Sequence, residues 1–192
     1  MALNEGGADA LSPILDAQGL THELLICSFQ YHPLLAQSDE SVIETVNAID
    51  RIVSWNLYPK VFSFFINECS EADELLRRNC TGVKSANDEA TTRALLATTT
   101  ARSGIDKMHC LTRFVEMVSA DCGGNGASAD DLVPALVYAI ARACPQMHLH
   151  AELAFIEKFC RNEIMFFGKD GYALTSVKGA VTAATHGDDE SS

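Results

Sequence analysis

The 192-residue chain has few basic residues. Its 14 lysines and arginines stand against 26 aspartates and glutamates, which gives a formal net charge of −12 at pH 7. Nucleic acids and anionic membrane surfaces are both recognised through a concentration of positive charge. The composition therefore argues against a nucleic-acid partner and against binding to an acidic membrane surface, and it permits a protein partner whose binding site is positive.

Long apolar runs are also lacking. No stretch approaches the ~20 apolar residues that a membrane-spanning helix requires. The first seven residues, Met1–Gly7, do not show the basic start and apolar run of a secretory signal peptide. We therefore expect a cytosolic protein without direct membrane insertion.

Motifs of redox, nucleotide and metal chemistry are absent as well. The seven cysteines include no C-x-x-C pair, and most have apolar neighbours, so we predict reduced core thiols. There is no G-x-x-x-x-G-K phosphate loop and no dinucleotide-binding fingerprint. A candidate metal set consists of Cys144, His148, His150 and Cys160. Its spacing matches no standard zinc site, and its two histidines would point about 200° apart on a helix, so we expect no metal and no cofactor.

The chain does contain a succession of apolar patterns with helical spacing. The predicted helices are 20–31, 38–56, 57–66, 70–78, a segment around 94–96, a helix from 106, 128–144, 147–159 and 172–184. The helix from Ser38 is predicted to stop before Pro59, and residues 1–19 are predicted to be a loose leader or a short helix at most. Ser70 and Asp73 have the spacing of a capping box.

One signal for β-structure competes with this pattern. Asp170-Gly171 lies between two apolar runs, as in a tight hairpin. A single hairpin would have no sheet to join, so we prefer a final helix from Tyr172. The predicted fold class is therefore all-α, a layered helical bundle.

The stretch Ser128–Tyr138, with the sequence SADDLVPALVY, restarts a helix after a glycine-rich break. Ser128 and Asp131 form a predicted capping box, and the aspartates lie in the first turn, where the helix dipole favours negative charge. The later residues are nearly all apolar, which predicts burial on most sides.

Pro134 is an anomaly in this predicted helix. Lying about six residues from the cap, it removes an N–H donor and leaves the carbonyl of Asp130 without its usual partner. From the residues alone two interpretations stay open. Asp130 is either an ordinary first-turn acid beside a tolerated kink, or a working carboxylate on a distorted turn.

Two motifs at the expected separation resemble the VPS-nine (vacuolar protein sorting nine) domain. They are S-A-D-D-hydrophobic-hydrophobic-P at 128–134 and G-x-D-G-Y-x-hydrophobic-T at 168–175. Lys107 and Cys110, and the segment Leu57–Phe62, are similar to weaker landmarks of the family. The resemblance covers roughly residues 42–184. It implies an all-helical layered domain that acts as a guanine-nucleotide exchange factor for Rab-five subfamily GTPases.

The resemblance also implies roles for single residues. Asp130 would be an acidic finger that enters the nucleotide site of the GTPase, with Tyr172 as its main contact partner. Asp131 and Pro134 would belong to the same partner-binding surface, and Thr175 would line the contact with the switch regions. The implied partner is a Rab-five-like GTPase, nucleotide-free or GDP-bound. This activity would involve no covalent chemistry. The resemblance also implies a cytoplasmic location with recruitment to early endosomes.

The expected organisation has three parts: a leader and helical extension at 1–41, the exchange domain at 42–185, and a disordered acidic tail at 186–192. Two positions depart from the family pattern, since Glu152 stands where asparagine is usual and Ala173 where an aromatic is usual. One alternative is therefore a module of the same fold that binds a GTPase without exchange. A metal- or thiol-dependent enzyme is a further alternative.

Overall fold

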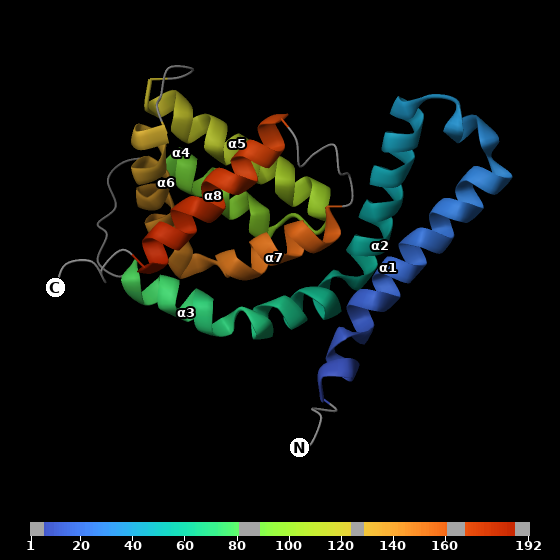
Figure 1. The fold of residues 1–192 in the computed structure, drawn as a ribbon, viewed down its shortest axis with the longest axis horizontal. Helices are drawn as coiled ribbons and strands as arrows, with labels where there is room; N and C mark the ends of the chain where they lie inside the picture. Colours follow the sequence, from blue (N-terminus) through green and yellow to red (C-terminus); the bar gives the residue numbers. More distant parts are fainter. Residues whose placement is uncertain (1–5, 81–88, 124–128, 161–167, 187–192) are drawn as a thin grey trace.

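The computed structural model describes residues 6–80, 89–123, 129–160 and 168–186, and every regular element in these ranges is helical. The α-helices are α1 (Gly6–Tyr31), α2 (Asp39–Glu68), α3 (Ser70–Asn79), α4 (Glu89–Leu96), α5 (Gly104–Asp121), α6 (Ala129–Ala143), α7 (Leu149–Phe159) and α8 (Gly168–His186). Short 3-10 helices occupy Pro33–Ala36, Ala97–Thr99 and Cys144–Gln146. The predicted all-α layered bundle is confirmed, and Figure 1 shows α1 and the first part of α2 as a hairpin beside the bundle of the other helices.

The prediction of a loose leader over residues 1–19 was wrong. Helix α1 begins at Gly6 and continues through Pro13 and Gly19 to Tyr31. Its inner side is anchored because Ile14 and Ala17 are buried in the cluster that α1 shares with α2, against which it packs. Burial of this side against a long partner helix outweighs the unfavourable helix propensities of proline and glycine.

The predicted end of a helix near Asn56 was also wrong. Helix α2 begins after Ser38, whose hydroxyl accepts the N–H of Ser41, but it continues through Pro59 to Glu68. The carbonyl that Pro59 leaves without a donor belongs to Trp55, and both residues are exposed, so water can satisfy it. The 57–66 segment predicted as a separate helix is therefore the second half of α2, which Figure 1 shows passing beneath the bundle.

Two hydrophobic clusters form the interior. The larger, which we call the aliphatic core, is built by α3–α8 and includes Leu95, Leu111, Leu136, Ile156 and Val177. The smaller, which we call the aromatic core, joins α1 and α2 to α7. Its members are Ile14, Ala17, Ile49, Val53, Val61, Phe65, Ala151, Phe155 and Phe159. Helix α7 thus contributes one side to each core and joins the hairpin to the bundle.

The helix predicted from Ser70 is present, but its capping box is not. Ser70 donates its hydroxyl backward to the carbonyl of Asn67, and no side chain caps α3. Asp73 is instead buried and accepts the backbone N–H of His150 at 2.7 Å. Because His150 lies in the first turn of α7, Asp73 caps a different helix from its own, which local spacing could not reveal.

Gly104 fixes the distance between α5 and α7. A side chain at this position would place its Cβ 2.5 Å from the backbone nitrogen of Cys160 and 2.5 Å from the carbonyl carbon of Phe159. Only glycine allows α5 to begin so close to the end of α7. This contact sets the position of α5, which forms one wall of the candidate site.

Candidate partner-binding face

Helix α6 presents the predicted acidic turn to solvent. Asp130 and Asp131 lie in its first turn and are exposed, and Pro134 lies inside the helix with its ring exposed. The proline leaves the carbonyl of Asp130 without its intrahelical donor, as predicted from sequence. The predicted cap Ser128 lies outside the described residues.

The expectation that this helix is buried on most sides needs correction. Leu132, Leu136 and Ile140 enter the aliphatic core, but Tyr138 remains 44% exposed. Asp130, Pro134 and Tyr138 are spaced four residues apart, so they form one stripe on the side facing away from the core. Helix α6 is therefore amphipathic, with its outer side available to a partner.

Helix α8 carries the other two predicted partner-binding residues, Tyr172 and Thr175. It begins at Gly168, whose φ of +71° lies in the left-handed region that favours glycine. The predicted final helix is thus confirmed, although it begins four residues before Tyr172. Tyr172 is 56% exposed, and Thr175 lies one turn further on, where its hydroxyl donates to the carbonyl of Gly171 at 2.8 Å.

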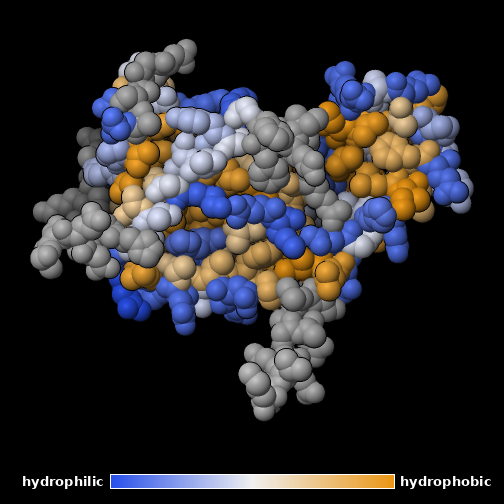
Figure 2. Space-filling model, in the orientation of Figure 1, coloured by the Kyte–Doolittle hydropathy of each residue, from blue (hydrophilic) through white to orange (hydrophobic). Residues whose placement is uncertain are grey.

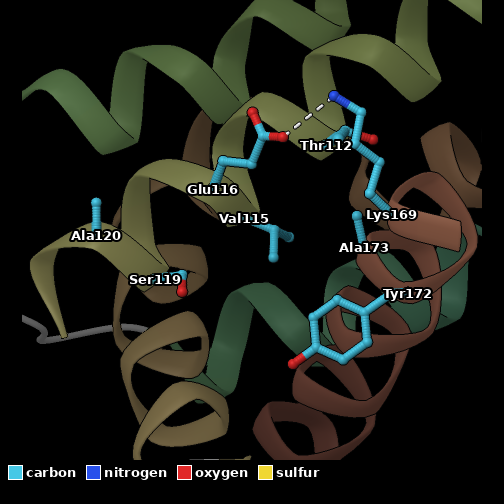
Figure 3. Close-up of a pocket in the computed structure, with 8 residues that line it drawn as sticks. All are labelled: Thr112, Val115, Glu116, Ser119, Ala120, Lys169, Tyr172 and Ala173. Carbon is cyan, nitrogen blue, oxygen red and sulfur yellow. Dashed lines mark hydrogen bonds and ion pairs between the residues drawn. The ribbon is translucent and has the colours of Figure 1, made fainter. Parts of the chain in front are cut away.

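Tyr172 stands at a hollow of about 350 Å³ between α5 and α8. The lining residues are Thr112, Val115, Glu116, Ser119, Ala120, Lys169, Tyr172 and Ala173. Figure 3 shows the Tyr172 ring extending from α8 on one side of this hollow, with Glu116 and Lys169 on the other. Val115 and Ala173 are buried, so they form an apolar floor suited to an apolar side chain of a partner.

Two contacts fasten the beginning of α8 to α5 across this hollow. The Thr112 hydroxyl donates to Asp170 Oδ1 at 2.6 Å, and the Lys169 ammonium lies 3.3 Å from Glu116 Oε1. Thr112 is 4% exposed, whereas Lys169 and Glu116 are both mainly exposed. Sequence reasoning missed Thr112, although a hydroxyl on an apolar face of the predicted helix was a usable signal.

The predicted site residues lie on two helices that pack together in the aliphatic core. Tyr172 lines the hollow between α5 and α8, but Asp130, Asp131 and Pro134 are not among its lining residues. Thr175 lines a separate hollow on the α7 side of α8, beside Glu157 and Lys178. The predicted residues are therefore exposed on two neighbouring helices, and the structure does not gather them into one hollow.

A buried ion pair between α5 and α7 was not predicted. Lys107 Nζ lies 2.5 Å from Glu152 Oε2 and also donates to the carbonyl of Thr98 at 2.7 Å. Lys107 and Glu152 are almost completely buried. The ammonium also lies 4.8 Å from the ring centroid of Tyr58 and 4.9 Å from that of Phe62, close enough for cation–π attraction.

Burial controls the ionisation of this pair. It raises the pKa of Glu152 to about 7, while the charge of Lys107 opposes the shift and that of Asp73 adds to it. Burial likewise lowers the pKa of Lys107, against the attraction of Glu152. The pair joins α5 to α7 beside the aromatic rings of α2, so it is a structural junction between these helices.

Other predicted features are placed as follows. The prediction of core thiols holds for Cys80, Cys144 and Cys160, which are buried, whereas Cys69, Cys110 and Cys122 are half-buried and Cys27 is exposed. Within the described ranges no cluster of three or more histidine, cysteine, aspartate or glutamate residues is arranged to hold a metal ion. In those same ranges no helix combines the length and apolarity needed to cross a membrane.

The described residues thus form an all-helical bundle with an exposed acidic turn on α6 and an exposed aromatic residue on the neighbouring helix α8. The model of the vacuolar sorting protein 9 (VPS9) domain matches residues 89–188, just over half of the chain. The chain belongs to the VPS9 domain family. The match begins at α4 and ends beyond α8, so it contains both helices of the exposed face.

Curated relatives show similarity over part of the chain. The chain is 32% identical over 79 residues to the mouse Rab5 GDP/GTP exchange factor and 30% identical over 79 residues to the human protein of that name. It is 38% identical over 80 residues to receptor-mediated endocytosis protein 6 of Caenorhabditis briggsae. Each alignment covers 40% of this chain, but only 16% of the two exchange factors and 7% of the nematode protein.

Proposed function

We propose that this chain is a guanine-nucleotide exchange factor that releases GDP from a Rab5-like small GTPase in endocytic traffic. The observation that carries the proposal is the family membership, together with exposed Asp130 and Pro134 on α6 and exposed Tyr172 on α8, which packs against α6. The exchange domain proper would occupy residues 42–185. Residues 1–41 would be a supporting extension, and 186–192 an acidic tail.

Asp130 would act as the acidic finger. A small GTPase holds guanine nucleotide through a P-loop lysine and Mg²⁺ at the phosphates. A carboxylate offered to that lysine replaces the phosphate as its partner, and its negative charge disfavours the returning phosphate. Asp130 suits this task because it is exposed on the first turn of α6. Asp131 and Pro134 would shape the same surface.

The hollow between α5 and α8 would bind the apolar switch residues of the GTPase. Nanomolar nucleotide binding corresponds to about −12 kcal/mol, so the exchange factor must stabilise the empty GTPase strongly. Tyr172 at the edge of the hollow supplies an aromatic contact of the kind that dominates such interfaces, and Thr175 would extend the contact across α8. Since coupling is reciprocal, incoming GTP would in turn expel the exchange factor.

A second candidate is a binding module of the same fold without efficient exchange. It is favoured by Ala173, which is 1% exposed and lines the hollow at a position where an aromatic is usual. The smaller side chain alters the surface that a switch region meets. Partner binding without accelerated nucleotide release would distinguish this candidate.

The test is the release of a fluorescent GDP analogue from a panel of Rab GTPases, with wild-type protein and with Asp130→Ala. We expect acceleration for Rab5-like members and a loss of about 100-fold in the variant, comparable to removing a preorganised electrostatic group from an active site. Because Asp130 is exposed, the variant should keep the wild-type melting temperature.

Three results would contradict the proposal in different ways. Acceleration of no GTPase, with retained binding, would favour the second candidate. Acceleration that survives Asp130→Ala would leave the activity in place and remove Asp130 as the finger. Loss of both activity and thermal stability in the variant would show that Asp130 is structural.

A further inference from the structure

Thr112 is a polar side chain on a face of α5 that is otherwise mainly apolar. It follows Met108 and Leu111 and precedes Val115, all of which are buried. A buried hydroxyl needs a hydrogen-bond partner, because an unsatisfied one costs stability. The partner is the carboxylate of Asp170, 58 residues further along the chain, at 2.6 Å.

Asp170 lies in the first turn of α8, two residues before Tyr172. This turn follows Gly168, whose left-handed backbone changes the direction of the chain at the helix start. An α-helix rises 1.5 Å and rotates 100° per residue, so the position of Asp170 determines the height and direction of Tyr172. Fixing Asp170 against α5 therefore fixes how Tyr172 faces the hollow.

The other contact between these helices is weaker. Lys169 and Glu116 have side chains that are 73% and 57% exposed, and their charged atoms are 3.3 Å apart. Exposed ion pairs contribute little because solvent screens them and two long side chains must be ordered. The hydrogen bond from Thr112 is buried on the donor side and has a charged acceptor, which makes it the stronger tether.

We propose that Thr112 is a positioning residue for partner recognition: through Asp170 it holds the first turn of α8 so that Tyr172 faces the hollow. The inference rests on the proposed function, because the partner met by Tyr172 is taken to be the GTPase. Without the hydroxyl, the half-buried Asp170 carboxylate turns toward water and the first turn of α8 shifts with it.

Three variants test this role. Thr112→Val removes the hydroxyl at nearly constant shape, Thr112→Ser keeps it, and Lys169→Met removes the exposed contact as a matched control. With a Rab5-like GTPase we expect Thr112→Val to lower kcat/KM about tenfold, mainly through KM, as the loss of one hydrogen bond to a charged group implies. Thr112→Ser should stay within about twofold of wild type, because it keeps the hydroxyl. Lys169→Met serves as the control for the hydrogen-exchange measurement.

Amide hydrogen exchange gives a readout that does not depend on the GTPase. In Thr112→Val the amides of residues 171–173 should exchange about tenfold faster than in wild type, with no such change in Thr112→Ser or Lys169→Met. Unchanged amide hydrogen exchange in Thr112→Val would show that Thr112 does not hold the first turn of α8, whatever the GTPase assay shows. Equal losses of kcat/KM in folded Thr112→Ser and folded Thr112→Val would also contradict the proposal, because the serine variant keeps the hydroxyl.

The proposed function fails separately. If the wild-type protein neither binds any Rab GTPase nor accelerates its GDP release, the proposed nucleotide-exchange function is wrong. The amide hydrogen-exchange result still tests the contact between Thr112 and Asp170. If wild type is active and Thr112→Val has an unchanged kcat/KM, Thr112 has no positioning role in recognition.

Discussion

The two cores of this molecule differ in composition and in their relation to the exposed face. The aliphatic core is built by α3–α8 and carries Asp130 on α6 and Tyr172 on α8 at its surface. The aromatic core is smaller and joins α1 and α2 to α7. Its rings are closely arranged, with Phe155 and Phe159 stacked at 4.7 Å and Phe65 edge-on to both.

This difference suggests a division of roles. The VPS9 match begins at α4, so α1 and α2 lie before the matched region. The described residues of the proposed face all lie on α5, α6 and α8, which belong to the aliphatic core. We therefore expect the hairpin to support α7, and through it the bundle, without contacting the GTPase through the face itself.

The hairpin also has a different surface. Exposed large hydrophobic residues are frequent on it: Leu15, Leu20, Ile26, Tyr31, Leu34, Ile52 and Trp55. Figure 2 shows a hydrophobic area on the hairpin, whereas a hydrophilic band crosses the bundle in the same view. The two regions therefore differ in exposed chemistry as well as in their cores.

The largest effect on stability is expected where the two cores meet. Glu152→Leu leaves the buried ammonium of Lys107 without its counter-charge, which costs about 3–5 kcal/mol of unfolding free energy. Denaturant unfolding measures this loss. The double variant Lys107→Met/Glu152→Leu should recover most of it, because an apolar pair replaces both charges. Equal destabilisation in the single and double variants would show that the charge pair is not the cause.

Disruption of the aromatic core should have a somewhat smaller effect. Phe65 on α2 is 7% exposed and contacts Phe64, Phe155 and Phe159. Phe65→Ala should lower the unfolding free energy by about 3 kcal/mol through lost burial and a cavity. Exchange activity per folded molecule should be unchanged well below the melting temperature. A parallel loss of activity would contradict the division between the two regions.

A further effect on stability is a pH dependence arising from Glu152. Its pKa is raised from 4.5 to about 7 by burial, so the folded state holds its proton more tightly than the unfolded chain. The contribution to stability is therefore fully present below about pH 4.5 and is lost as pH rises toward 7. Burial lowers the pKa of the neighbouring Lys107, against the attraction of Glu152.

Unfolding of wild type and Glu152→Gln across pH 4.5–7 isolates this contribution. Glutamine does not titrate, so the wild-type stability should fall relative to the variant as pH rises. Parallel curves for the two proteins would mean that Glu152 titrates at the same pH in the folded and unfolded states.

The sequence predicted the fold class and most helices because their apolar residues recur at helical spacing. It failed where distant packing decides the local structure. Gly6, Gly7 and Pro13 favour a loose leader locally, but burial of Ile14 and Ala17 holds the segment in α1. Pro59 similarly lies within a continuous helix because the second half of α2 packs on α7.

The candidate site was predictable only in part. The motifs around Asp130 and Tyr172 identified the two helices of the exposed face. The contacts that organise them, Thr112 with Asp170 and Lys107 with Glu152, join residues 58 and 45 positions apart. No local period brings such pairs together, so their partners become visible only in the folded chain.

The most direct test of the account compares Asp130→Ala with Phe65→Ala in one GDP-release assay on a Rab5-like GTPase, with melting temperatures measured in parallel. The account predicts that Asp130→Ala loses exchange at the wild-type melting temperature, and that Phe65→Ala melts earlier while exchanging at the wild-type rate. Normal exchange by Asp130→Ala together with defective exchange by folded Phe65→Ala would contradict it and would move the functional surface to the side of the aromatic core.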